Sequence, residues 1–230
     1  MNMLDITFID PFEDQKYKGF FGRFRRSSKF FRTYLRNPFW LIFGIFIVVF
    51  AMTVVVSYAA KSQAFEFVSS IISDIFRGNG IIGSDNTISV VNLFLNNLRA
   101  ACVSFILGFV PFLYLPTVSV LGNAIIAGLM VGYIGVGLNY DLLHSLLYVL
   151  AGIIPHGIFE IPALLLACAM GYATCTQLNK QIFRKRTKWP FDTMMGEMGW
   201  YIVLKIIPLL IIAACVETWL TPMLMRYVRF

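Results

Sequence analysis

Nine polar side chains lie inside or at the edges of long apolar stretches, and they are the candidates for chemistry. They are Asn96, Asn97, Arg99, Asn123, Asp141, His156, Glu160, Lys205 and Glu217. A charge at the centre of a bilayer costs about 2.5–3.5 kcal/mol on insertion scales, so such groups are expected to face protein or water and to pair. We expect Arg99 to pair with Glu160, and Lys205 either to neutralise Asp141 or to extend to an interface.

His156 and Glu160 are four residues apart, so a helix that starts at the Pro155–Gly157 break places both on one face. Glu160 then lies in the first turn, where the helix dipole favours a negative charge. Three interpretations stay open: a buried ion-pair and capping network, a path for a polar substrate or ion, and a catalytic centre. We favour the structural network.

Recognised catalytic motifs are absent from the sequence. A membrane zinc protease needs HExxH, whereas here Glu160 follows His156 by four residues and the other histidine, His144, lies twelve residues earlier. These three residues can bind a metal if the chain folds back, but the spacing does not demand it. Walker A and GxSxG motifs are also missing. We therefore predict a protein that is not an enzyme and holds no metal or cofactor.

The composition indicates an integral membrane protein. Of 230 residues, 58% are hydrophobic and 13% are charged, and the mean hydropathy is +0.74. A soluble domain carries about 25% charged residues. The predicted fold class is all-α, a polytopic transmembrane helical bundle.

The net charge of +7 is concentrated beside the apolar stretches. Eight of the nineteen basic residues precede residue 38, and five lie in 180–188. Lys and Arg of this kind stay on the cytoplasmic side of a membrane and attract anionic headgroups. We predict a multi-pass protein of the cytoplasmic (inner) membrane with its N-terminus inside, bound to the lipid bilayer and not to nucleic acid.

The N-terminal segment interleaves aromatic and basic residues. Residues 1–37 are predicted to be a cytoplasmic tail followed by an amphipathic helix in the headgroup plane. The residues expected to meet the membrane surface are Phe20, Arg23, Phe24, Arg25, Arg26 and Phe31. A merely basic tail is the alternative.

Residues 38–230 are predicted to form a single transmembrane domain. Its spans are expected at about 39–60, 92–114, 117–137, 142–177 and 199–220, with a second surface helix within 61–87.

The fourth of these stretches is ambiguous. It is long for one span, and Gly152, Pro155, Gly157 and Pro162 interrupt it. If both halves crossed, the basic cluster 180–188 would lie outside, against the positive-inside rule. A re-entrant first half or one bent crossing keeps that cluster inside. We therefore predict five crossings plus a re-entrant or broken element at 142–162.

Small residues recur every fourth position in the third span, at Ala124, Gly128 and Gly132. This spacing lets helices approach closely in lipid. It predicts helix packing there and fits a homo-oligomer.

The run PHGIFEIPALLLACAMGYA at 155–173 resembles the Pro-His-Gly…Glu…Pro-Ala core of the stage II sporulation protein M family. Asn96-Asn97-Leu98-Arg99-Ala100 and Leu121-Gly122-Asn123 are similar to that family's Asn-Asn and Asn-Gly landmarks, in the same order. Ala124 departs from the family, which usually has Gly after this Asn. The resemblance covers roughly 90–180.

The resemblance implies an integral membrane protein of about five spans without established enzymatic activity. Its namesake anchors peptidoglycan-degrading proteins at the septal membrane in endospore formers. The family motif carries over to Asn96, Asn97, Asn123, Pro155, His156, Gly157 and Glu160.

The functional hypothesis is therefore a non-enzymatic scaffold that holds other membrane or cell-wall-associated proteins at the membrane. The alternative is a permease-like subunit with a polar site at 155–160, working with a separate ATPase.

Overall fold

The computed structural model describes residues 19–78, 89–185 and 190–227, and in these ranges the chain is helical apart from short connections such as 110–115 and 138–141, without strands. Five stretches are long and apolar enough to cross a membrane, as the sequence predicts. The helices, including short π and 3₁₀ segments labelled η, are α1 Gly19–Phe30, η2 Phe31–Leu35, α2 Arg36–Ala59, α3 Lys61–Gly78, α4 Val90–Ile106, η3 Leu107–Phe109, α5 Pro116–Gly137, α6 Leu142–Ile182, α7 Phe191–Tyr201, η4 Ile202–Ile206, α8 Ile207–Cys215, η5 Val216–Leu220 and α9 Thr221–Met225.

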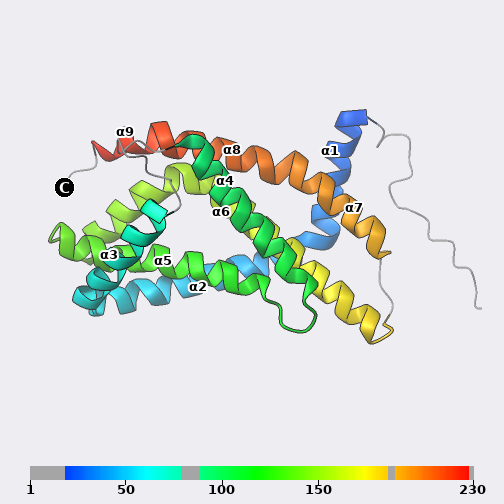
Figure 1. The fold of residues 1–230 in the computed structure, drawn as a ribbon, viewed down its shortest axis with the longest axis horizontal. Coiled ribbons are helices and arrows are strands. Elements are labelled where there is room, and N and C mark those ends of the chain that lie inside the picture. The colour runs from blue at the N-terminus through cyan, green and yellow to red at the C-terminus, as the bar shows by residue number, and fades with distance from the viewer. Residues whose placement is uncertain (1–18, 79–88, 186–189, 228–230) are drawn as a thin grey trace, which may run out of the picture.

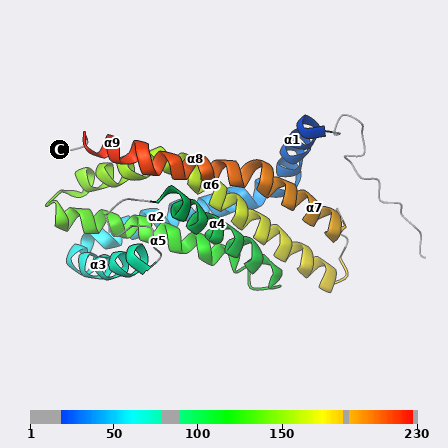
Figure 2. The same cartoon turned by 45° about the horizontal axis from the view of Figure 1, so that its top comes forward.

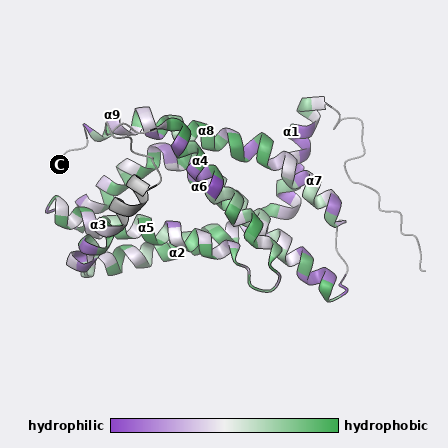
Figure 3. Cartoon of the chain, viewed as in Figure 1, coloured by the Kyte–Doolittle hydropathy of each residue, from purple (hydrophilic) through white to green (hydrophobic). Residues whose placement is uncertain are grey.

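The spanning helices form an elongated bundle. Helices α2 and α5 lie side by side along one flank, α7 to α9 follow the other, and α4 and α6 cross between them (Figures 1 and 2). Hydrophobic residues dominate α2, α5 and α8, whereas hydrophilic residues gather in α1 and at the C-terminal end of α6 (Figure 3). The arrangement is that of a multi-pass membrane protein.

Helix α3 is the second amphipathic helix that the sequence predicts after the first span. It packs on α5, where the Phe65 and Tyr133 rings stack with centroids 4.9 Å apart. The end of the stretch 61–87 lies outside the described residues.

Residues 142–182 correct one expectation. The predicted re-entrant or broken element at 142–162 is instead part of one uninterrupted 41-residue helix, α6, with Pro155 and Pro162 inside it. The helix changes direction near its middle (Figure 1). A proline removes one backbone hydrogen bond and its ring displaces the preceding turn, which bends a helix without ending it. Of the alternatives for this stretch, the structure has the single bent helix.

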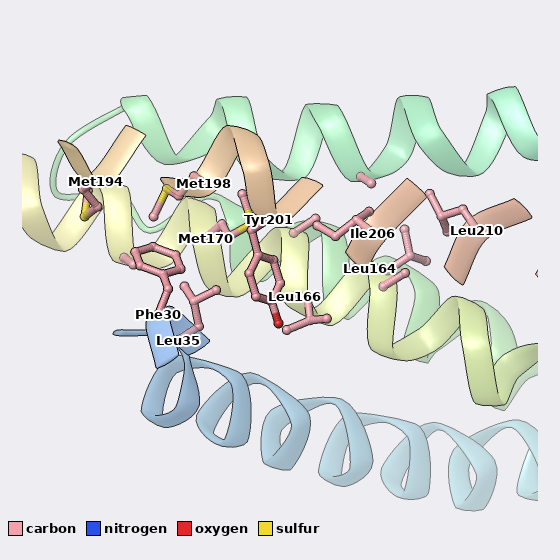
Figure 4. Packing of buried hydrophobic residues seen from close by; sticks show 14 residues of the cluster. Phe30, Leu35, Leu164, Leu166, Met170, Met194, Met198, Tyr201, Ile206 and Leu210 are labelled. Carbon is pink, nitrogen blue, oxygen red and sulfur yellow. The ribbon is translucent and has the colours of Figure 1, made fainter. Parts of the chain in front are cut away.

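The second half of α6 is the centre of the bundle. Every residue from Ala163 to Gly171 is buried, as expected for a helix that is apolar on all sides. Phe30 and Leu35 reach it from the N-terminal helix, and Met194 and Met198 from α7 (Figure 4). This cluster joins the first and last spanning segments to α6.

Glycines let two pairs of helices cross at backbone contact. A Cβ on Gly108 would collide with the backbone of Gly171, and one on Gly132 with the carbonyl of Ser57. The Ser57 hydroxyl also donates a 2.8 Å hydrogen bond to the Gly128 carbonyl oxygen. Close approach of this kind is the main source of helix association in lipid, where burial of apolar surface adds little.

We expect Gly132→Ala to destabilise the bundle by about 1–3 kcal/mol, because its methyl group meets a backbone carbonyl that cannot rotate away. Thermal unfolding in detergent measures the loss. Gly122→Ala, on the same helix, has nothing within 4 Å and serves as the control. Equal melting temperatures for the two variants would contradict the packing of α5 on α2.

Candidate functional site

A polar cluster lies at the bend of α6 and consists of His156, Glu160 and Glu217. One ligand atom from each residue lies within 4.8 Å of the other two, and all three side chains are half-buried. His156 and Glu160 are one turn apart on α6, and Glu217 comes from η5, which with α9 packs against α6 (Figure 1). The chain thus brings together two carboxylates and an imidazole inside its spanning segments.

A threonine fixes the orientation of the imidazole. His156 Nδ1 lies 3.4 Å from Thr221 Oγ1, and the Thr221 hydroxyl donates to the Val216 carbonyl oxygen at 3.3 Å. When that hydroxyl proton is directed to Val216, the threonine oxygen is left to accept from Nδ1, and in this tautomer Nε2 is the unprotonated nitrogen.

Asn97 of α4 borders the cluster from another side. Its side chain interacts with the Glu160 carboxylate and the residue is only 7% exposed. The amide nitrogen nevertheless has no hydrogen-bond partner at ordinary geometry among the described residues. Buried amides are rarely left so, which marks this point as a place where a polar ligand fits.

A cavity of about 120 Å³ adjoins His156 and Glu160, and Asn123 and Gly157 also line it. This volume holds several water molecules. Asn123 donates its side-chain amide to the Ser119 carbonyl oxygen at 3.1 Å. A wholly apolar groove of about 310 Å³ between α2, α5 and α6 shares Gly157 with this cavity.

Two expected ion pairs are absent from the described residues. Arg99 is exposed and makes no ion pair with Glu160, because α4 turns Asn97 toward Glu160 and Arg99 outward. Lys205 does not neutralise Asp141, since its Nζ lies 3.2 Å from the centroid of the Phe24 ring. The Arg99–Glu160 pairing is wrong because helix rotation, which spacing alone does not give, decides which face of α4 meets the core. Of the two alternatives for Lys205, the pairing with Asp141 is the one that the structure does not have, and its extension to an interface stays a prediction.

Asp141 instead caps the start of α6, outside the spans. Its carboxylate accepts the backbone N–H of His144 at 2.8 Å and lies 2.6 Å from the same residue's ring nitrogen. The N–H hydrogen bond, followed by the ring contact, holds the pKa of Asp141 below its ordinary value.

The other residues that the sequence pointed to lie on α4, at the bend of α6 and on α5. Asn96 and Pro155 are half-buried, and Gly157 is buried in the bend of α6. Ala124, Gly128 and Gly132 lie buried on α5, and both glycines pack against α2. None of these last three touches the polar cluster, so they serve the packing of the bundle.

The N-terminal helix is tied to α7. The Arg26 side chain donates a 2.6 Å hydrogen bond to the nearly buried carboxylate of Glu197, and the Arg23 guanidinium lies 4.0 Å from the Trp200 ring centroid. Phe20 and Phe24 are exposed. Arg25 is exposed and Phe31 is half-buried. Part of the predicted surface helix is thus an element of the bundle.

Sequence reasoning noticed Glu217 as a polar residue in an apolar stretch but did not join it to His156 and Glu160. It missed Thr221 altogether. Glu217 and Thr221 lie about sixty residues after Glu160 in the sequence. Only the packing of η5 and α9 on α6 brings them next to His156 and Glu160. The intramembrane carboxylate of Glu217, which needs a partner, was the one available signal.

The order of the landmarks and the five spans lead to a comparison with known families. The family model of Stage II sporulation protein M matches residues 38–222. The chain belongs to the stage II sporulation protein M family. Neither the search of curated proteins nor that of solved structures gives a match.

The matched range reaches all five spans and contains His156, Glu160 and Glu217. The stage II sporulation protein M family is not a known enzyme family. The arrangement at the α6 bend suits binding of a cation or a proton, with two carboxylates and an imidazole in a low-dielectric setting.

We expect Arg26→Met to destabilise the protein by about 1–3 kcal/mol, because it leaves the Glu197 carboxylate buried without this donor. Thermal unfolding in detergent, together with proteolytic release of α1, measures the effect. Arg25→Met removes an exposed neighbouring charge and should change neither reading. Similar melting temperatures for both variants would show that α1 does not depend on this ion pair.

Proposed function

We propose that this protein is a non-enzymatic membrane scaffold that holds partner membrane or cell-wall-associated proteins at the cytoplasmic membrane. The observation that carries the proposal is Arg99. It lies midway along the span Val90–Phe109, on the exposed side of α4, where a hydrophilic patch interrupts the helix (Figure 3).

Arg99 has no carboxylate partner among the described residues. It is about 15 Å from either end of the span, more than an arginine side chain covers by extending to an interface. Leu95, Val103 and Ile106 surround it on the same exposed, apolar face. A guanidinium in such a place is stabilised by a carboxylate from another transmembrane helix.

That carboxylate does not come from a second copy through the same face. Within its spans the chain has four acidic residues: Glu197 pairs with Arg26, Glu160 and Glu217 face each other, and Asp192 lies at the end of a span. A different protein with an intramembrane Asp or Glu fits Arg99 better. The small residues of α5 are buried within the chain, so a homo-oligomer would use another face.

The permease-like alternative has one observation in its favour, the polar cavity beside His156 and Glu160. It predicts that Glu160→Gln abolishes transport of a substrate in membranes that also contain the ATPase. A scaffold keeps its partners when Glu160 is changed and loses them when Arg99 is changed.

A photo-crosslinking amino acid at position 95, one turn from Arg99, tests the scaffold in native membranes. We expect it to capture a protein whose transmembrane segment contains a carboxylate, and we expect Arg99→Leu to abolish that crosslink whereas Arg99→Lys retains it. The same probe at the exposed position 55 on α2 is the control.

Charge exchange decides whether the captured contact is an ion pair. Replacing the partner's carboxylate by Lys should restore the crosslink in an Arg99→Glu variant. A crosslink that survives Arg99→Leu, or one that captures lipid alone, would contradict the proposal.

A further inference from the structure

We propose that His156, Glu160 and Glu217 bind one divalent first-row transition-metal ion within the membrane. The inference does not depend on the scaffold function. Three observations carry it: converging donor atoms, uncompensated carboxylates, and a buried amide without a partner.

The donors converge from two segments. The ligand atoms of the three side chains lie within 4.8 Å of one another. A metal holds such ligands at about 2.0–2.2 Å, which places ligand atoms roughly 3.3 Å apart in tetrahedral geometry. Small rotations of these half-buried side chains close this difference, and the cavity that His156 and Glu160 line leaves those two room to move.

The imidazole is already arranged as a metal ligand. His156 Nδ1 lies 3.4 Å from the Thr221 hydroxyl, and a hydrogen bond from Nδ1 to that oxygen leaves the lone pair of Nε2 free for a metal. Metal-binding histidines almost always donate their second ring nitrogen to a neighbouring oxygen in this way. A histidine used only for packing has no need of this ordered chain of hydrogen bonds.

The charges require a cation or a proton. Glu160 and Glu217 face each other in a low-dielectric region, and no Lys or Arg forms an ion pair with either within the described residues. Two carboxylates this close cannot both ionise unless a positive charge lies between them. A divalent ion neutralises both and binds the imidazole as well, which a shared proton does not.

Asn97 and the cavity supply the rest of the coordination shell. Asn97 is 7% exposed and borders Glu160, and its amide nitrogen has no hydrogen-bond partner at ordinary geometry among the described residues. A water molecule on the metal that reached this amide would satisfy it. The cavity of about 120 Å³ that His156 and Glu160 line has space for water on the metal.

The donor set indicates the class of ion. Imidazole suits Zn, Fe, Cu and Ni, whereas Mg²⁺ and Ca²⁺ prefer oxygen ligands alone. One nitrogen with two carboxylates and water is therefore expected to prefer Zn²⁺ or a similar ion. Bound there, the metal joins the bend of α6 to the segment Val216–Met225.

Metal analysis of the full-length protein in detergent tests the site. After treatment with chelator, the protein is loaded with Zn²⁺, dialysed and assayed for zinc per chain. We expect one zinc in the wild type and a near-complete loss in His156→Gln, Glu160→Gln and Glu217→Gln. His144→Gln and Glu66→Gln, which change an exposed histidine and an exposed carboxylate, should keep it.

Two further measurements exclude misfolding as the cause of a loss. Thr221→Val keeps all three ligands and is expected to weaken zinc binding roughly 10–100-fold. Wild-type protein loaded with Co²⁺ should show visible absorption bands of a nitrogen- and oxygen-ligated ion. Equal zinc in the cluster variants and the controls, no zinc in the wild type, or Mg²⁺ preferred over Zn²⁺ would overturn the proposal.

Discussion

An ionised side chain inside hydrocarbon has to find an opposite charge, a proton or water, and this constraint shapes the whole bundle. Glu197 satisfies this constraint by pairing with Arg26, and this ion pair joins the N-terminal helix to α7. Glu160 and Glu217 lie together beside His156, where the end of the last span meets the first half of α6, and they require a cation or a proton between them. Arg99 faces outward and forms no ion pair within the described residues, which is why we propose a partner protein at this face.

The bend of α6 makes the second of these arrangements possible. A straight helix of 41 residues is about 62 Å long, roughly twice the hydrocarbon thickness. Pro155 and Pro162 bend it so that its second half fills the centre of the bundle while His156 and Glu160 face the C-terminal segment. Backbone-to-backbone crossings such as Gly108 on Gly171 hold that second half in place. Helix α6 thus positions both the polar cluster and the buried core of the bundle.

Composition and span length predicted the fold well, because a lipid-facing helix must be long and apolar whatever it packs against. The small-residue spacing at Gly128 and Gly132 likewise marks a face that touches α2. What could not be predicted depends on rotation and register: whether Asn97 or Arg99 faces Glu160, and that Glu217 and Thr221 reach His156. The prolines also misled, since in α6 they bend the helix without breaking it. The prolines in 142–162 do alter the helix, but the packing of the neighbouring helices determines that they bend it and do not end it.

The central claim is that the C-terminal segment lies against the first half of α6. A Cβ at position 152 would lie 3.7 Å from the sulfur of Met225. In protein without its native cysteines, a Gly152→Cys/Met225→Cys pair should therefore form a disulfide rapidly on mild oxidation in membranes. Gly44→Cys/Met225→Cys, with nothing within 4 Å of Gly44, should not. Failure of the first pair to crosslink, or equal crosslinking of both, would contradict the account.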